Sequence, residues 1–182
     1  TGASPAVVVS VGSVGVGGPI FTTSSKLGSH AGSFDGSSWI TTPLVTNSTN
    51  MSMMAWVNLE TTSEFGTFIQ AGNANGIGLG VGNTIMENDP GNNLIMHIVD
   101  IAWVSTAIAI GTGWHQVAVT RNAGNYKFYI DGNNIYNYSG EQSTPTTNSN
   151  IGAYNSVGGG NLTLSGGNLL DEAAIYNITL SS

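Results

Sequence analysis

The chain has 182 residues and a net charge of −7, because ten acidic residues stand against only three basic ones, Lys26, Arg121 and Lys127. Three cations cannot neutralise a run of phosphates, which excludes nucleic-acid binding and argues equally against acidic membranes and sulfated polysaccharides. The sequence has no cysteine, which excludes disulfides, thiolate catalysis and zinc–thiolate sites. A neutral partner that is recognised by hydrogen bonds and ring stacking fits this composition better.

The uncharged residues indicate an all-β protein with many turns. The chain holds 20 Asn, 20 Ser, 19 Thr and 26 Gly, and it is poor in the Ala, Leu, Glu and Lys that helices favour. Helical spacing of apolar residues is almost absent, whereas short runs with a period of two recur along the chain. In chain order these runs predict strands at residues 6–11, 51–59, 67–71, 77–81, 94–99, 105–110, 114–121, 126–131, 134–138, 150–154 and 169–178.

The segments between these runs contain residues suited to hairpin turns. Three dipeptides accept the positive φ that a two-residue turn requires: Asp35-Gly36, Asn75-Gly76 and Asp131-Gly132. The longest apolar run, Leu94 to Ile110, is interrupted by His97 and Asp100, so two successive strands explain it better than a membrane span. Many short strands without crossover helices predict an antiparallel two-sheet β-sandwich or a barrel.

We expect one domain over residues 1–182, because no composition change divides the chain. Residues 1–32 belong either to the sandwich or to an N-terminal arm, and the alternation of Val7, Val9 and Val11 favours the sandwich. The chain begins at Thr1 rather than Met, so we expect a processed product or an excised fragment of a larger multidomain or multimeric assembly.

Three motifs, in this order, resemble those of a known family. They are Ser33-Phe34-Asp35-Gly36 with Trp39-Ile40 and 53–57, then 114–121 with 128–132, and finally 170–176 with 180–181. Together they resemble the laminin-G-like branch of the concanavalin A-like lectin/glucanase superfamily. The resemblance implies a jelly roll of two curved antiparallel sheets with its first and last strands adjacent. We expect the aromatic residues of these motifs to fill the core: Phe34, Trp56, Trp114 and Phe128.

Catalysis is not expected. Glucanases on the resembled fold use a Glu-x-Asp-x-Glu strand, and retaining hydrolysis needs two carboxyl groups about 5 Å apart. Here Glu87-Asn88-Asp89 is followed by Pro90 and Gly91, which favours a turn. The three histidines lie far apart in sequence, and His115 matches a structural histidine of the family. No catalytic residue is therefore assigned, and a glycoside hydrolase is the least favoured function.

The resemblance also implies a structural calcium ion in several relatives, with Asp171 at the position of a carboxylate ligand. Calcium takes six to eight oxygen ligands, and the N-terminal region that would supply carbonyl groups has no acidic residue before Asp35. The alternative role for Asp171 is to accept backbone hydrogen bonds near the end of a strand. The sequence leaves both roles open.

Loops on such a sandwich gather at one rim, where ligands bind. A sugar needs an aromatic ring for stacking and amide or carboxylate groups for its hydroxyls. We expect these groups in three loops: Asn73 and Asn75, then Asp100 and Trp103, then Asn150, Tyr154 and Asn155. Packing of Trp103 in the core is the alternative to an exposed position.

The predicted function is a non-catalytic recognition or adhesion module, a lectin-like domain that binds a neutral carbohydrate or a surface protein. The alternative is a structural or display domain of a virion or cell-surface assembly, such as a capsid decoration or a fibre. Both place the protein outside the cell, on the cell surface or on a virion.

Overall fold

The computed structural model describes residues 18–44, 49–83, 90–155, 161–164 and 166–181. These residues form fifteen strands and no helix, and none of their segments is a helix long and apolar enough to cross a membrane. The strand predicted at residues 6–11 and the Glu87-Asn88-Asp89 motif lie outside the described residues. Every strand pairing found is antiparallel.

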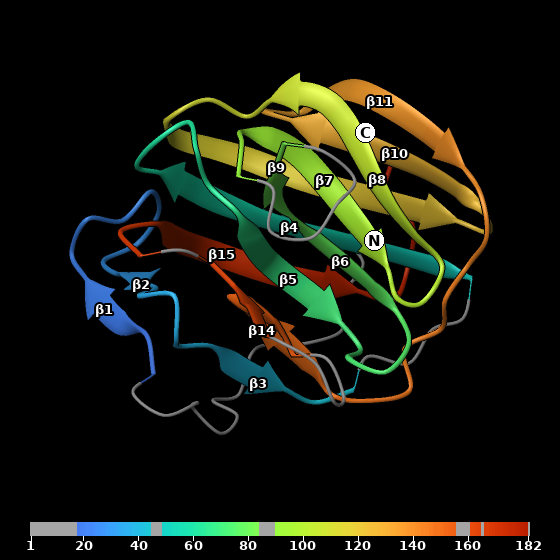
Figure 1. Ribbon diagram of the computed structural model, residues 1–182, viewed down its shortest axis with the longest axis horizontal. Coiled ribbons are helices and arrows are strands. Elements are labelled where there is room, and N and C mark those ends of the chain that lie inside the picture. Colours follow the sequence, from blue (N-terminus) through green and yellow to red (C-terminus); the bar gives the residue numbers. More distant parts are fainter. Residues whose placement is uncertain (1–17, 45–48, 84–89, 156–160, 165, 182) are drawn as a thin grey trace.

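Two large sheets pack face to face (Figure 1). The seven-stranded sheet has the order β1 (Ile20–Thr22), β2 (Ala31–Ser33), β15 (Leu169–Tyr176), β4 (Asn50–Leu59), β9 (Gly113–Asn122), β10 (Asn125–Ile130) and β11 (Asn133–Ser139). The six-stranded sheet has the order β3 (Ile40–Thr42), β12 (Ser149–Ile151), β5 (Gly66–Ala71), β6 (Ile77–Gly82), β7 (Asn93–Ile98) and β8 (Ala102–Ala109). A third, two-stranded sheet joins β13 (Ala153–Asn155) to β14 (Asn161–Thr163). The predicted antiparallel two-sheet sandwich is confirmed.

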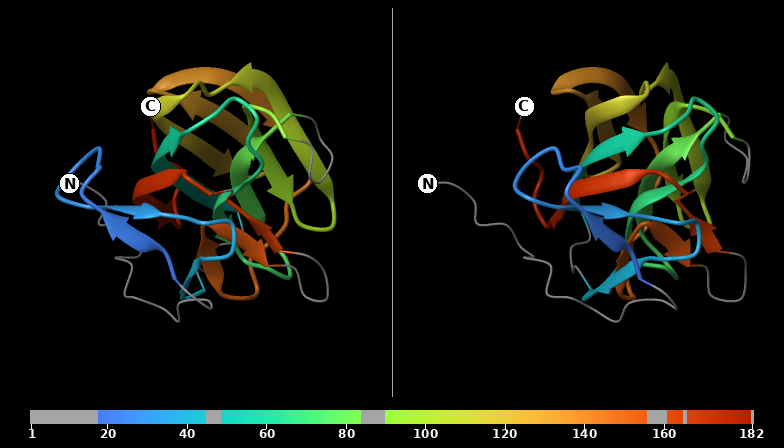
Figure 2. Two further views of the ribbon diagram at one scale, coloured as in Figure 1. Left: turned by 60° about the vertical axis from the view of Figure 1, so that its left-hand side comes forward. Right: turned by 90° about the vertical axis from the view of Figure 1, so that its left-hand side faces the viewer.

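The last strand lies beside one of the first. β15 pairs with β2 on one side and with β4 on the other, and β1 extends this sheet beyond β2. The side views in Figure 2 look onto the margin that β1 and β2 form. The expected limits of the domain, 1–182, stay a prediction because residues 1–17 are not described.

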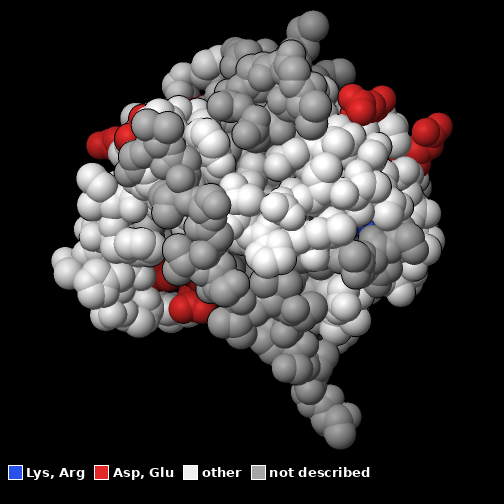
Figure 3. Space-filling view, turned by 90° about the horizontal axis from the view of Figure 1, so that it is seen from below, with Lys and Arg blue, Asp and Glu red and all other residues white. Residues whose placement is uncertain are grey.

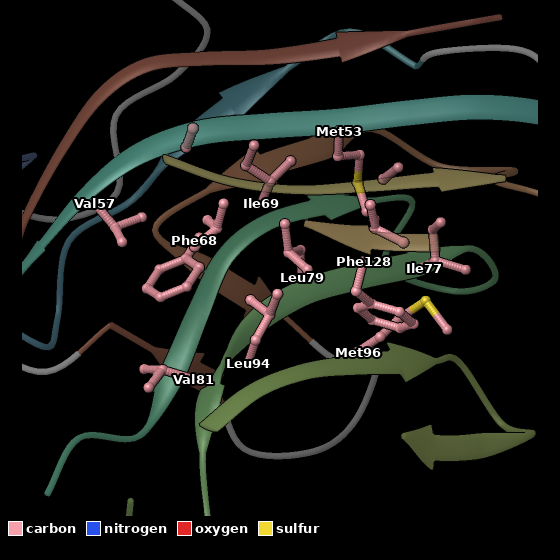
Figure 4. Close-up of a cluster of buried hydrophobic side chains, with 14 of the residues drawn as sticks. Met53, Val57, Phe68, Ile69, Ile77, Leu79, Val81, Leu94, Met96 and Phe128 are labelled. Carbon is pink, nitrogen blue, oxygen red and sulfur yellow. The ribbon is translucent and has the colours of Figure 1, made fainter. Parts of the chain in front are cut away.

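The core lies between the two sheets and follows the predicted alternation. On β4, Met53 and Val57 point inward with 0% exposure, and so does Phe128 of β10. Figure 4 shows these side chains facing those of β5, β6 and β7, among them Phe68 and Leu79. Burial of each such side chain contributes roughly 1.5–3 kcal/mol, so this layer supplies most of the stabilising contacts.

Two of the four aromatic residues expected in the core lie elsewhere. Phe34 and Phe128 are buried, with exposures of 1% and 0%. Trp56 and Trp114 are half-buried and stand on the outer face of the seven-stranded sheet. Trp56 alternates with core residues on β4, so its side chain must point to the opposite face. The prediction was wrong for both tryptophans because it relied on their large apolar rings, whereas the alternation along each strand places them on the outer face.

The turns carry the backbone conformations expected from their residues. Asp131 and Gly132 have φ values of 51° and 77°, the pair of positive angles that a type I′ hairpin turn needs. The run predicted as one strand at 150–154 is divided at Gly152, whose φ is 85°. A Cβ at Gly152 would overlap the ring of Phe34. The chain bends there, which separates β12 from β13.

Candidate functional site

The candidate site is built where two hairpin turns of the six-stranded sheet meet. β5–β6 and β7–β8 are hairpins that turn at the same end of the sheet, because β5 and β7 run in the same direction. The N–H of Val99 donates to the carbonyl of Gly76 at 3.0 Å, which joins the two turns. The predicted ligand residues Asn73 and Asn75 lie in the first turn, and Asp100 lies in the second.

The amide groups of this rim are largely engaged with the chain itself. Asn150 of β12 is 1% exposed, and its Nδ2 donates to Oδ1 of Asn73 at 3.1 Å. Asn73 in turn donates Nδ2 to the carbonyl of Asn148 at 3.3 Å. Asn75 is exposed, and its Nδ2 donates to the hydroxyl of Thr146 at 3.1 Å. Asn73 and Asn150 therefore hold the 143–148 loop against the sheet, while Asn75 keeps a solvent-facing side chain.

Four aromatic rings lie next to this rim, on the outer face of the six-stranded sheet. We call them the aromatic patch: Phe65, His97, Trp103 and Tyr154. The rings of His97 and Trp103 are stacked with centroids 4.1 Å apart and planes inclined by 10°. Tyr154 contacts His97 edge-on at 4.7 Å, and Phe65 lies 6.4 Å from Trp103. Such contacts hold the indole in one orientation.

Trp103 is neither in a loop nor in the core. It lies on β8, where it is the cross-strand partner of His97, so the expected loop position is wrong. It is half-buried and packs against a second small cluster that contains Val99, Tyr154 and Leu162. Its indole is therefore partly accessible to solvent beside the exposed Asp100.

His97 is buried in its neutral form. The residue is 8% exposed, and burial lowers the pKa of its imidazole to about 4, although the nearby Asp100 opposes this shift. Its Nδ1 has no hydrogen-bond partner among the described residues. A neutral ring suits its position between two aromatic rings, because a charged imidazolium would lose its hydration there.

A glycine of β6 makes room for the side chain of Gln70 in the row that contains His97. Gly78 lies between Gln70 of β5 and His97 of β7 in one row across the sheet. A Cβ at Gly78 would overlap the side-chain oxygen of Gln70, which is 0% exposed. The glycine therefore lets the amide of Gln70 lie flat on the sheet, where its Nε2 donates to the carbonyl of Gly72 at 2.6 Å.

Asp171 stands away from the aromatic patch, on β15 of the seven-stranded sheet. It is 6% exposed, and its Oδ2 accepts the backbone N–H groups of Lys26 at 2.9 Å and Leu27 at 2.8 Å. Two N–H donors directed at this oxygen do not fit a cation bound to it, and calcium needs several further oxygen ligands. No group of three or more His, Asp or Glu suited to a metal occurs in the described part of the chain. The arrangement matches the alternative role that the sequence left open, and calcium stays a prediction.

Two residues of the patch, Phe65 and His97, were not among the predicted site residues. The signal for His97 was its position: it alternates with the core residues Met96 and Ile98, so it had to face outward. The structure brings it together with Trp103 and Tyr154, which were predicted in separate loops. Tyr154 lies on β13 and Asn150 on β12, so the loop position expected for these two residues is wrong as well. Whether these residues bind a ligand stays a prediction.

The comparison with protein-family models identifies the family of this chain. A family model described as the concanavalin A-like lectin/glucanases superfamily matches residues 34–182. The chain belongs to this superfamily. The resemblance inferred from the three motifs is thereby confirmed, and no curated protein sequence matches the chain.

Solved structures share the fold of this superfamily member. Domain 4 of AbnA, a GH43 extracellular arabinanase from Geobacillus stearothermophilus solved with arabinotriose, is 24% identical with a TM-score of 0.66, over 91% of this chain and 78% of that chain. The carbohydrate-binding module CBM66 from Bacillus subtilis is 10% identical with a TM-score of 0.54, over 91% and 96%. Trypanosoma rangeli sialidase is 14% identical with a TM-score of 0.54, over 84% of this chain and 26% of the sialidase. At these identities the likeness establishes the fold.

Proposed function

We propose that this protein is a non-catalytic recognition module that binds a neutral carbohydrate at the aromatic patch. The observation that carries the proposal is the half-buried indole of Trp103, stacked at 4.1 Å on a buried neutral His97. A ring that is already ordered loses little entropy when a sugar stacks on it.

Polar groups beside the ring can hydrogen-bond to sugar hydroxyls. Asp100 is exposed in the β7–β8 turn, and its φ of 60° is characteristic of a tight turn. Asn75 is exposed in the adjoining turn, and its Oδ1 makes no hydrogen bond within the described residues. An aromatic face with a carboxylate and an amide nearby is the combination that sugar recognition requires.

The relatives support a binding role rather than turnover. AbnA domain 4 was solved with arabinotriose, and CBM66 is a carbohydrate-binding module. The arabinanase that contains domain 4 is extracellular, which supports an extracellular or surface location for this chain as well. The likeness to a sialidase supports no catalytic role, since this chain spans about a quarter of that enzyme, 26%.

The test is a titration of the protein with neutral oligosaccharides, beginning with arabinotriose and monitored by backbone amide NMR. A glycan array extends the test to further sugars. We expect shifts at residues around Trp103, and Trp103→Ala should weaken binding by at least about tenfold. Trp114→Ala removes a half-buried tryptophan from the other sheet and is the matched control, which should bind as the unaltered protein does. A folded protein that binds no glycan but captures a surface protein through Trp103 would contradict the carbohydrate ligand.

A further inference from the structure

The three cations of the chain differ in what they contact. The ammonium group of Lys26 lies 4.6 Å from the ring centroid of Trp56. Arg121 is 0% exposed, and its Nη1 donates to the carbonyl of Ser143 at 2.8 Å. Lys127 is exposed, and no ion pair or hydrogen bond of its side chain is found within the described residues. Lys26 and Lys127 are both exposed, but the ammonium group of Lys26 is placed against an aromatic ring, whereas no such partner of Lys127 is found within the described residues.

Lys127 lines a hollow on the outer face of the seven-stranded sheet. It is the cross-strand partner of Thr120 on β9, and Tyr129 follows two residues later on the same face of β10. The hollow has a volume of about 500 Å³, and its remaining lining includes Asn122, Asn125 and the segment 179–181. This volume lies within the range of small-molecule sites. The lining combines one half-buried aromatic ring, one cation, and several amide and hydroxyl groups.

The segment 179–181, which forms the other part of the lining besides the β9–β10 hairpin, is held in place by hydrogen bonds. The hydroxyl of Thr179 donates to the carbonyl of Arg121 at 2.5 Å. The N–H of Leu180 donates to Oγ of Ser52 at 2.9 Å, and this hydroxyl donates to the carbonyl of Ile178 at the same distance. The hollow is therefore preformed, which lowers the cost of binding.

We propose that this hollow binds a sugar residue that carries a single carboxylate, of the hexuronic acid class. Lys127 provides the point charge for the carboxylate, Tyr129 provides a ring for stacking, and the amides of Asn122 and Asn125 can bond to hydroxyl groups. The net charge of −7 opposes a polyanion, because the field of the protein repels densely charged chains. Acidic side chains are scattered over the surface in small groups, as one face shows in Figure 3. One carboxylate facing one lysine avoids this repulsion.

The site is separate from the aromatic patch, which lies on the other sheet, and it goes beyond the neutral-sugar function proposed above. Its test compares methyl β-D-glucuronide with methyl β-D-glucoside, two probes that differ in whether C6 is a carboxylate or a hydroxymethyl group. Amide NMR titration of the whole chain follows each probe. We expect the glucuronide to shift the amides of Thr120, Asn125 and Tyr129, and the glucoside to shift them only at much higher concentration.

Variants that change the net charge equally distinguish binding at Lys127 from a general electrostatic effect of the whole protein. Lys127→Gln should weaken glucuronide binding by about fivefold, the scale of an exposed ion pair, and Lys127→Arg should retain most of it. Lys26→Gln changes the net charge equally at another place and should leave the affinity unchanged. Equal responses to both probes, no response to either, or an equal loss in Lys26→Gln would overturn the proposal. Trp103→Ala should not affect this titration, so failure of one site is distinguishable from failure of the other.

Discussion

The outer faces of the two sheets differ in how exposed their residues are, and the strand sequences do not predict this difference. On the six-stranded sheet, the outward residues Gln70, His97 and Asn150 are 0%, 8% and 1% exposed. On the seven-stranded sheet, the outward residues Trp56 and Lys127 are half-buried and exposed, respectively. Both sheets show the same alternation. The six-stranded sheet is covered beside His97 by Tyr154 of β13, whereas segments 26–27 and 178–181 cover only parts of the seven-stranded sheet.

The cover is formed by segments distant in sequence. Tyr154 of β13 lies against His97, and the hydroxyl of Thr147 accepts the N–H groups of Asn73 and Ala74 at 2.6 and 3.1 Å. The covered face thus holds its polar groups in a dry, ordered setting, whereas the open face leaves an aromatic ring and a cation accessible. A neutral ligand suits the first setting, and a charged one suits the second, because charges keep their hydration more easily on an open surface.

The largest expected effect comes from removing the bend that allows the cover to form. Gly152→Ala should destabilise the protein by about 3 kcal/mol, since it combines a strained positive φ with an overlap onto the ring of Phe34. Chemical denaturation measures this change. Gly132→Ala is the matched control: its φ is also positive, but a Cβ there meets no atom within 4 Å, so about 1 kcal/mol should be lost. Equal losses in the two variants would show that the Phe34 contact does not matter.

A smaller effect is expected from titration of the covered face. His97 has a pKa of about 4 in the folded protein, below its ordinary value of 6.5, so the unfolded chain binds more protons between these values. Stability should therefore be complete above pH 6.5 and fall by roughly 2 kcal/mol as the pH drops to 4. Thermal melts across this range measure the effect, and His97→Phe should remove it.

Asp35 is expected to affect stability in a lower pH range than His97 does. The Ser37 N–H and hydroxyl, both 2.9 Å from Oδ1, lower the pKa of Asp35 to about 2. Its contribution is therefore lost only as the pH falls from about 4 towards 2. A profile of His97→Phe that still falls between pH 6.5 and 4 would contradict the assignment.

The smallest effect is expected at an ion pair on the open side. His115 Nδ1 lies 2.8 Å from Oδ2 of Asp131, which also accepts the N–H of Gln116 at 2.9 Å through Oδ1. Although desolvation opposes it, these bonds lower the pKa of the Asp131 carboxyl. Asp131→Asn should cost less than about 1 kcal/mol in denaturation, and less still at high salt. Asp100→Asn, at another hairpin turn with positive φ, should leave the free energy of unfolding unchanged at pH 7. A larger loss of stability in Asp100→Asn than in Asp131→Asn would contradict this prediction.

The sequence predicts features that depend on neighbouring residues, but it does not predict those that depend on residues far apart in the chain. Val117 and Val119 lie two residues apart in the strand predicted at 114–121, and both are in the core with 0% and 1% exposure. The bend at Gly152 could not be foreseen, because it depends on the ring of Phe34 more than a hundred positions earlier in the chain. The engagement of Asn73 and Asn150 with each other likewise arises from two segments that meet only in the folded protein.

From the sequence alone follow the all-β class and the alternation of inward and outward residues on the strands, because a period of two and turn dipeptides act over a few residues. Membership of the superfamily was indicated by the resemblance of three motifs and is shown by the family model. Tertiary structure decided which outer face is covered, that Trp103 stacks on His97, and that Lys127 stays open beside Tyr129. These features depend on contacts between strands that are remote in the chain, and alternation assigns a residue to a face without saying what lies on it.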